Sequence, residues 1–223
     1  MYKMAAEQLP CVFHVSARTV ATQALSIFGD HSDVMACRQT GFAMLCETNP
    51  QEVMDLGAVA HLSAIAGKVP VMHFFDGFRT SHEQQKISVW DYDELRSMVD
   101  WDAVKRFREN ALNPNHPHSM GSAEQPETFF QHREACNKNY DDTVEIVAKY
   151  MDMVSEKTGK TPHYKPFNYY GAEDAEEVIV AMGSVCDAIE EAIDYANANG
   201  KKTGLVVVRL YRPFSRKYFL EAL

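Results

Sequence analysis

The stretch from Asn49 to Phe75 constrains the fold of this chain more than any other. Asn49 can cap a helix, Pro50 suits the first helical position, and Glu52 can reach back to the cap. Apolar residues then recur at helical spacing up to Gly67, which suits a helix end. The run VPVMHFF that follows is short and continuously apolar, which is typical of a buried strand.

A second apolar run precedes this helix. DVMACR, residues 33–38, indicates a short buried strand that ends at the polar turn 39–41. A helix between two such strands is the pattern of a βαβ unit. We therefore expect an α/β fold with a mostly parallel sheet and helices on both of its faces.

Another βαβ unit is predicted toward the end of the chain. EEVIVAMG is a strand, Ser184 and Asp187 box the start of a helix that Gly200 ends, and TGLVVVRL is the partner strand. This pattern divides the chain into a first domain over residues 1–174 and the beginning of a second α/β domain over residues 175–223. Because a sheet that stops after one βαβ unit keeps an open apolar edge, we expect the chain to be part of a longer protein.

The segments between these units carry weaker signals. Helices are predicted over residues 16–28, 91–99 and 100–112, from Asp142 onward, and in the final YRPFSRKYFLEAL. Residues 113–127 are rich in Pro, Gly, Asn and Ser, which favours a loop. Residues 157–174 combine Pro, Gly and aromatic residues and indicate a linker that packs on the surface.

Charge and composition exclude several classes of protein. The net charge of −9 leaves no basic surplus to neutralise phosphates, so we expect no binding to nucleic acid or to an anionic membrane. No apolar run has the roughly 18 residues that suggest a membrane span. The five cysteines lack CxxC spacing, so we predict neither a disulfide framework nor a metal site from this chain, as suits a cytoplasmic protein.

The loop DGFRTSHEQQK after the strand VPVMHFF is the main candidate site. Ligands of parallel sheets bind beyond the carboxyl ends of strands, and Arg79 lies in that zone. Its guanidinium is a flat fork of donors that fits a carboxylate or a phosphate. Thr80 and Ser81 both open capping patterns, so a helix start here would also attract an anion. The residues indicate a clamp for a small acid.

Three further residues share this prediction, and a simpler alternative stands beside it. Thr80 follows Arg79 directly, while Arg38 and Thr40 end the strand predicted over residues 33–38, so all three are candidate substrate-binding residues. On spacing alone, the alternative is that Arg79 pairs with a nearby Asp or Glu and only holds its loop.

Other patterns favour structure over function. His116 and His118 have the spacing of a zinc ligand pair, but the segment around them favours an ordered loop. His14 suits a buried, hydrogen-bonded histidine, and the turn Met182–Ser184 suits packing better than phosphate binding. No GxGxxG, Walker, GxSxG or HExxH motif occurs.

Several long segments resemble one family. The stretch from DVMACRQTGFAML to DGFRTSHEQQK strongly resembles the N-terminal domain of pyruvate:ferredoxin (flavodoxin) oxidoreductases. LPCVFHVSARTVATQALSIFGDH, NPNHPHSMGSAEQPETFFQHREA and VVVRLYRPF are similar to the same family. The resemblance implies a thiamine pyrimidine-binding-type first domain followed by the start of a transketolase C-terminal-like domain.

The resemblance also implies an activity. Members of the family oxidatively decarboxylate pyruvate on thiamine diphosphate with Mg²⁺, transfer the acetyl group to coenzyme A, and pass electrons through [4Fe-4S] clusters to ferredoxin or flavodoxin. It implies that Arg79 binds the pyruvate carboxylate, that the enzyme is a homodimer, and that the remaining domains act as partners of this chain. The CxxCxxC cluster ligands and a Gly-Asp-Gly metal site are absent here. We therefore expect this chain to be inactive alone.

Two alternatives remain open at this point. A relative could act on another 2-oxo acid, because the pocket wall that selects the acid is not recognisable in the sequence. The chain could also be a non-catalytic binding or assembly module that docks on partner subunits.

Overall fold

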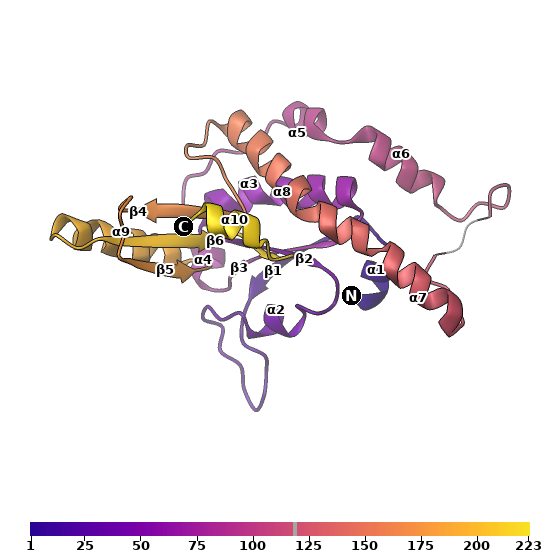
Figure 1. Ribbon diagram of the computed structural model, residues 1–223, viewed down its shortest axis with the longest axis horizontal. Helices are drawn as coiled ribbons and strands as arrows, with labels where there is room; N and C mark the ends of the chain where they lie inside the picture. The colour runs from indigo at the N-terminus through magenta and orange to yellow at the C-terminus, as the bar shows by residue number, and fades with distance from the viewer. Residues whose placement is uncertain (118–119) are drawn as a thin grey trace.

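The strands of the described residues form two sheets (Figure 1). The computed structural model describes residues 1–117 and 120–223. The first sheet, in the order β1-β3-β2-β7, consists of β1 (Val12–Ala17), β3 (Val71–Asp76), β2 (Ala43–Glu47) and β7 (Leu210–Arg212). β1 and β2 run parallel to β3, and β7 lies antiparallel beside β2. The carboxyl ends of β1, β2 and β3 therefore meet at one edge of the sheet.

The second sheet is smaller and contains the predicted later βαβ unit. It has the order β4-β6-β5, with β4 (Phe167–Gly171), β6 (Thr203–Val208) and β5 (Glu177–Ala181). β5 and β6 are parallel and are connected through α9 (Val185–Ala198), while β4 pairs antiparallel with β6. Parallel pairs outnumber antiparallel pairs in the first sheet, and the second sheet has one pair of each kind. This arrangement confirms the expected α/β class with flanking helices.

Two long helices cover one face of the first sheet (Figure 1). α3 (Pro50–Gly67) packs against β1, β2 and β3, and α8 (Asn137–Thr158) packs against α3 on the same side of the sheet. Leu45 of β2, Leu56 of α3 and Met151 of α8 are fully buried between them. The residues that the first sheet, α3 and α8 bury together form the main apolar core.

The opposite face of the first sheet is covered by short helices (Figure 1). α1 (Tyr2–Ala6) and α2 (Ser32–Ala36) lie there, and Val34 belongs to the same buried apolar cluster as Met44 and Phe74 of the sheet. The remaining helices of the described residues are α4 (Arg79–His82), α5 (Tyr92–Met98), α6 (Trp101–Glu109), α7 (Pro126–Ala135) and α10 (Arg216–Glu221). None of the described helices is both long enough and apolar enough to cross a bilayer.

The predicted start of the long helix is confirmed in detail. The Asn49 side chain accepts a hydrogen bond from the Glu52 N–H, and Pro50 is the first helical residue. Lys68, in the left-handed conformation, ends α3 directly after Gly67. One detail differs, because the Glu52 carboxylate accepts from the N–H of Thr48 and not from that of Asn49.

Two predictions near the start of the chain are wrong. Residues 16–28 are not a helix, because the strand β1 continues to Ala17 and a loop follows in which Leu25 and Phe28 are exposed. Residues 33–38 are not a strand, because α2 occupies most of them. The strand before α3 is instead β2, which is buried along its whole length. A short apolar run does not distinguish helix from strand, and here the packing of α2 across the sheet decided.

The remaining predictions are largely confirmed. The two charged surface helices are α5 and α6, the helix predicted from Asp142 begins earlier at Asn137, and α10 closes the chain. The segment 157–174 is more than a linker, since it contains β4 and a buried Tyr164. The boundary between residues 174 and 175 stays a prediction, although β4 pairs with β6 across it.

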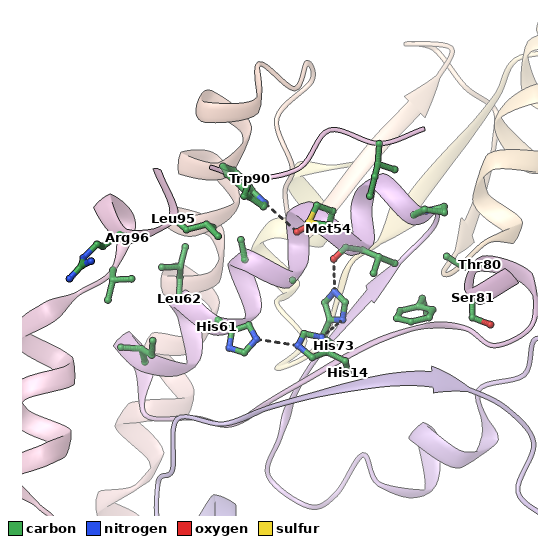
Figure 2. A pocket seen from close by; sticks show the side chains of 18 of the residues that line it. His14, Met54, His61, Leu62, His73, Thr80, Ser81, Trp90, Leu95 and Arg96 are labelled. Carbon is green, nitrogen blue, oxygen red and sulfur yellow. Dashed lines mark hydrogen bonds between the residues drawn. The ribbon is translucent and has the colours of Figure 1, made fainter. Parts of the chain in front are cut away.

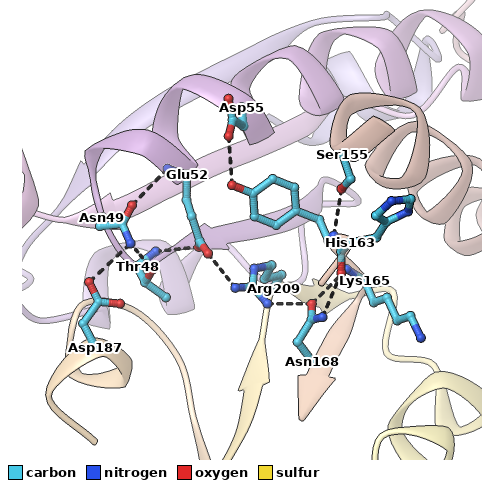
Figure 3. Close-up of polar contacts among 11 residues, drawn as sticks. Thr48, Asn49, Glu52, Asp55, Ser155, His163, Lys165, Asn168, Asp187 and Arg209 are labelled. Carbon is cyan, nitrogen blue, oxygen red and sulfur yellow. Dashed lines mark hydrogen bonds and ion pairs between the residues drawn. The ribbon is translucent and has the colours of Figure 1, made fainter. Parts of the chain in front are cut away.

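A buried ion pair joins the two sheets (Figure 3). Arg209 lies between β6 and β7, and its Nη2 donates to Oε1 of Glu52 in α3 at 2.5 Å. Its Nη1 donates to Oδ1 of Asn168 in β4 at 2.7 Å. The guanidinium carbon also lies 5.4 Å from the ring centroid of Tyr164, which adds a cation–π contact. One side chain thus holds α3, β4, β6 and β7 together.

This pair gives a stability prediction. Glu52→Ala leaves Arg209 charged, buried and unpaired, so we expect a loss of about 3–5 kcal/mol in the free energy of unfolding. The single variants Glu52→Leu and Arg209→Met each leave one buried partner unpaired, whereas the double variant removes both charges and should lose less than these two losses added together. Urea denaturation of Glu52→Ala, the two single variants and the double variant measures this.

The exposed pair Lys217–Glu145 supplies the control, because both side chains are 61% exposed. Lys217→Ala should leave the urea midpoint unchanged. Equal losses in the Glu52 and Lys217 variants would contradict a special role for the buried pair.

Candidate functional site

The parallel pairing of β1 and β3 brings two arginines to one edge of the first sheet. The strands are in register, with Ala17 opposite Asp76. Arg18 directly follows β1, and Arg79 lies three residues beyond β3. Because ligands of parallel sheets bind outside the carboxyl ends of strands, this edge is the candidate anion site.

Arg79 is exposed and carries its charge without a partner. It begins α4, and its side chain makes no hydrogen bond or ion pair with any residue of the ranges 1–117 and 120–223. The alternative of a pair with a nearby Asp or Glu is therefore not seen among these residues. The expected helix ends already at His82, and four residues are too few for a helix terminus to add a second attraction. What remains at this position is the guanidinium charge itself.

Arg18 was missed by the sequence prediction and is the second arginine of the edge. It is half-buried, and its Nε has no hydrogen-bond partner among the described residues, although the atom is shielded from solvent. A buried donor without an acceptor is costly, and an anionic ligand would satisfy it. The signal that could have found it is the strand VFHVSA, because Arg18 is the first residue after that strand.

Gly77 explains how the two arginine segments approach each other. A methyl group placed on Gly77 would lie 2.5 Å from the Ala17 carbonyl oxygen and 2.7 Å from Cγ of Arg18. No side chain fits in that space, so only glycine allows the loop after β3 to lie directly against Arg18. The Gly77 N–H also donates to the Ala17 carbonyl at 2.8 Å, which continues the ladder between the strands.

The residues on either side of Arg79 are fixed. Phe78 has a φ of 66°, its N–H donates to Oγ of Ser81, and its ring stacks edge-on against Phe28 at 4.6 Å between centroids. Thr80 is buried, and its hydroxyl lies 3.5 Å from the carbonyl oxygen of Thr48 at the end of β2. The backbone that carries Arg79 is thus held on both sides, while its side chain is free.

Asp76 joins three loops at this edge. Its Oδ1 contacts Nε2 of His31, and its Oδ2 accepts from the backbone N–H of Ser184 at 2.7 Å. Burial acts to raise the pKa of Asp76, but the hydrogen bonds from His31 and Ser184 outweigh burial and bring the pKa to about 2. Asp76 is therefore a carboxylate at neutral pH, and both of its oxygens are occupied.

Arg38 and Thr40 do not share this edge. They follow the helix α2 and precede the amino end of β2, so the argument that placed them beyond the end of a strand was wrong. The Arg38 side chain is exposed and donates to the carbonyl of Met35, and the Thr40 hydroxyl donates to the carbonyl of Cys37. Both bonds are local and close the turn after α2.

A large apolar groove lies beside α3 (Figure 2). Its volume is about 1070 Å³, and it runs between one face of α3, the segment around Trp90 and the helices α5 and α6. Thr80 and Ser81 line one end of the groove, whereas Arg79 does not line it. The arginine edge and the groove are therefore adjacent features that meet at α4.

Three histidines form a hydrogen-bonded chain on the floor of this groove (Figure 2). Nε2 of His73 donates to the Val53 carbonyl at 3.1 Å, which leaves Nδ1 of the neutral ring as an acceptor. Nδ1 of His14 lies 3.0 Å from that atom and donates to it, so Nε2 of His14 accepts from Nε2 of His61 at 3.1 Å. The prediction of a hydrogen-bonded His14 is right, but this side chain is exposed and not buried.

Desolvation shifts the pKa values of the three hydrogen-bonded histidines and of Glu47, which lies beside His73. Burial lowers the pKa of His73 to about 3, and it also lowers the pKa values of His14 and His61. Glu47, fully buried beside His73, has its pKa raised well above the usual range, mainly by burial. The three histidines are therefore neutral near pH 7, and burial favours the neutral form of Glu47, which suits an apolar wall better than a cation site.

The other candidate positions fit structural roles. His116 lies exposed in the loop before α7, and His118 lies outside the described residues. Among residues 1–117 and 120–223, no group of three or more His, Cys, Asp or Glu side chains is arranged to hold a metal ion. The turn Met182–Ser184 packs against Asp76, as the packing interpretation predicts.

Two family profiles match this chain. The profile described as "Pyruvate flavodoxin/ferredoxin oxidoreductase, thiamine diP-bdg" matches residues 1–152. The profile described as "Pyruvate:ferredoxin oxidoreductase core domain II" matches residues 175–223.

Curated relatives are similar along the whole chain. The chain is 58% identical to a pyruvate:ferredoxin oxidoreductase of Moorella thermoacetica over 100% of its own length and 19% of that protein. It is 58% identical to a pyruvate-flavodoxin oxidoreductase of Enterobacter agglomerans over 99% of its own length and 19% of that protein. The chain thus spans about a fifth of the length of these relatives.

A solved structure shares the fold. It is a 2-oxoglutarate:ferredoxin oxidoreductase from Magnetococcus marinus with 2-oxoglutarate, coenzyme A and succinyl-CoA bound. The TM-score is 0.63 at 14% sequence identity, over 98% of this chain and 40% of that chain. At this identity the likeness concerns the fold alone.

The histidine chain gives a prediction for the dependence of stability on pH. The unfolded chain binds a proton at His73 near pH 6.5, whereas the folded chain does so only near pH 3, so folding loses stability as the pH falls through this window. His73→Gln keeps a donor for the Val53 carbonyl and removes this titration. Urea midpoints between pH 7 and pH 4 should therefore fall less steeply in the variant. The exposed His116→Gln serves as the control, and equal slopes in wild type and His73→Gln would contradict the prediction.

Proposed function

Because this chain belongs to the pyruvate flavodoxin/ferredoxin oxidoreductase family, we propose that it is part of an enzyme that oxidatively decarboxylates pyruvate. In this proposal the acetyl group passes to coenzyme A and the electrons pass to ferredoxin or flavodoxin. The support is the match of the family profile to residues 1–152 and the 58% identity to two such enzymes.

The chain supplies the side of the site that binds the substrate carboxylate. Arg18 and Arg79 stand at the carboxyl ends of neighbouring parallel strands, and neither side chain is neutralised by an ion pair among the described residues. The single observation that carries this assignment is the shielded Nε of Arg18, which lacks an acceptor that a carboxylate would provide. Thr80 fixes the backbone beside Arg79 and is a supporting residue.

The two arginines differ in what they offer an anion. Arg18 is half-buried and held against Gly77, so its charge is partly desolvated and directional. Arg79 is exposed, so water screens its charge and its contribution is mainly attraction and capture. In decarboxylation the carboxylate leaves as neutral CO2 and its electron pair stays on the remaining carbon, so a site that held the carboxylate too tightly in the ground state would slow the step. One partly desolvated and one solvent-screened arginine can bind the carboxylate without holding it too tightly.

Thiamine diphosphate fits the described residues only in part. When bound, it supplies the electron sink for decarboxylation. The apolar groove with neutral histidines suits an uncharged ring system, whereas the described residues hold no acidic cluster for the Mg²⁺ of a diphosphate group. We therefore assign to this chain a wall of the cofactor site, and assign Mg²⁺, the diphosphate and the [4Fe-4S] clusters to other parts of the enzyme.

The partners follow from the same proposal. They are pyruvate, coenzyme A, ferredoxin or flavodoxin, and the remaining domains of the enzyme, which we expect to work as a homodimer in the cytoplasm. A relative that acts on another 2-oxo acid is the nearest alternative, and a non-catalytic assembly module is the other. A panel of 2-oxo acids assayed anaerobically with the full-length enzyme separates the first alternative from the proposal.

The arginine edge gives the main test of this function. In the full-length enzyme, Arg18→Ala and Arg79→Ala should each raise the KM for pyruvate, and Arg18→Ala should slow decarboxylation on the order of 10²-fold because a desolvated charge-assisted contact is lost. Arg38→Ala is the matched control, since Arg38 is exposed and bonds only to its own turn. Unchanged pyruvate kinetics in both the Arg18 and the Arg79 variants would overturn the assignment.

A second test concerns the chain by itself. We expect the 223-residue chain, supplied with thiamine diphosphate, Mg²⁺, coenzyme A and pyruvate, to reduce no dye, because its described residues hold no cluster or metal ligands. Pyruvate-dependent turnover by the chain alone would show that the site is more complete than proposed.

A further inference from the structure

An acidic side chain stands among the two arginines of the proposed anion site. Asp76 is the last residue of β3, three positions before Arg79. A methyl group placed on Gly29 would lie 3.4 Å from Cβ of Asp76 and 3.7 Å from Cγ of Arg79, so these two side chains flank the same point. Arg18 lies beside Gly77, the next residue after Asp76. A free carboxylate here would compete with a substrate carboxylate for both guanidinium groups.

The structure keeps this carboxylate away from the arginines. Oδ1 of Asp76 is bound by His31, and Oδ2 is bound by the Ser184 N–H at 2.7 Å. No ion pair between Asp76 and Arg18 or Arg79 occurs in the described part of the chain, while the contact with His31 does. The carboxylate is therefore ionised, and each of its oxygens already has a hydrogen-bond partner other than an arginine.

Two close approaches show that this arrangement is built into the fold. A methyl group on Gly183 would lie 3.0 Å from Oδ2 of Asp76 and 3.1 Å from Cε1 of His31, and Gly183 itself has a φ of 84°. The His31 ring packs edge-on against Phe74, with 5.3 Å between centroids, which fixes its position over the carboxylate. Three segments that are distant in sequence thus surround one carboxylate.

The backbone N–H of Arg18 has a hydrogen-bond acceptor, whereas Nε of its side chain has none among the described residues. The Arg18 N–H donates to Oδ2 of Asp33 at 2.9 Å, while Oδ1 of Asp33 accepts from the Val34 N–H. The second carboxylate near Arg18 is thereby also occupied by backbone donors. Asp33, like Asp76, thus binds hydrogen-bond donors other than a guanidinium group, so the pattern at Asp76 is not isolated.

We propose that His31 and the Ser184 N–H sequester the Asp76 carboxylate, so that Arg18 and Arg79 remain available to the carboxylate of the substrate. His31 is a positioning residue in this proposal, since it acts on the substrate only through Asp76. The inference rests on the proposed function, because it takes the two arginines as the substrate-binding groups. It also assigns a role in substrate binding to Ser184 and Gly183, which belong to the turn before α9.

The decisive experiment is a charge-removal cycle in the full-length enzyme. His31→Ala frees the Asp76 carboxylate to pair with an arginine, so we expect the KM for pyruvate to rise about tenfold while kcat changes by less than about twofold. Adding Asp76→Asn removes the competing charge and keeps an oxygen for the Ser184 N–H. The double variant His31→Ala with Asp76→Asn should therefore return KM to within about twofold of wild type.

A merely structural role for His31 gives a different result. Loss of packing would leave the double variant as impaired as His31→Ala, or more so, and that result would overturn the proposal, as would an unchanged KM in His31→Ala. His31→Gln retains a side-chain donor for Asp76 and should show a smaller rise in KM than His31→Ala. Thermal unfolding of each variant confirms that folded enzymes are being compared.

Two further arms complete the design. His132→Ala breaks a similar histidine–carboxylate pair on the surface, with Glu124 at 2.7 Å, and should leave KM unchanged. Arg18→Ala and Arg79→Ala are measured in parallel. If neither of these raises KM, the proposed substrate site is wrong; if they raise KM and His31→Ala does not, only the sequestration of Asp76 is wrong.

Discussion

The buried contact between Arg209 and Glu52 is the interaction on which the arrangement of the two sheets depends (Figure 3). Burial would raise the pKa of Glu52, but the charge and hydrogen bond of Arg209 outweigh burial and keep the pKa below its usual value. Both groups are therefore charged inside the protein, where an unpaired charge would be costly. Since Arg209 follows β6 and precedes β7, the pair fixes the point at which the chain leaves the second sheet and joins the first.

The position of the proposed anion site follows from this arrangement. The turn before α9 belongs to the second sheet, yet its Ser184 N–H binds Asp76 at the end of β3 in the first sheet. A second bond, from Asn49 at the start of α3 to Asp187 in α9 at 3.3 Å, ties the same regions together. The edge with Arg18 and Arg79 thus adjoins both sheets, and the turn of the second sheet supplies one of the two hydrogen bonds that Asp76 accepts.

The groove and the arginine edge divide the chemistry between them. The edge holds permanent positive charge near solvent, whereas the groove is apolar and partial or full desolvation lowers the pKa values of its three histidines, of which only His73 is buried. In the proposed function, the substrate carboxylate needs the charged edge and the uncharged ring of the cofactor needs the apolar groove. The two environments must therefore lie side by side. The two features meet at α4, where Thr80 lines the groove and Arg79 belongs to the edge.

The sequence by itself determined the features that rest on local interactions. The cap of Asn49 with Pro50 placed the start of α3, the apolar run placed β3, and the position of Arg79 after β3 indicated an anion site. These signals involve neighbours within a few residues, so they are legible in one sequence. The family resemblance was also present in the letters alone and is confirmed by the profile matches.

Only the tertiary structure decided the rest. Whether VFHVSA is a strand, and DVMACR a helix, depends on which faces the sheet buries, and an error there concealed Arg18 at the end of β1. The engagement of Asp76 needs His31 and Ser184, which lie 45 and 108 residues away in the chain. No local pattern encodes contacts over such separations, because they exist only once β1, β3 and the turn before α9 have been brought to the same edge.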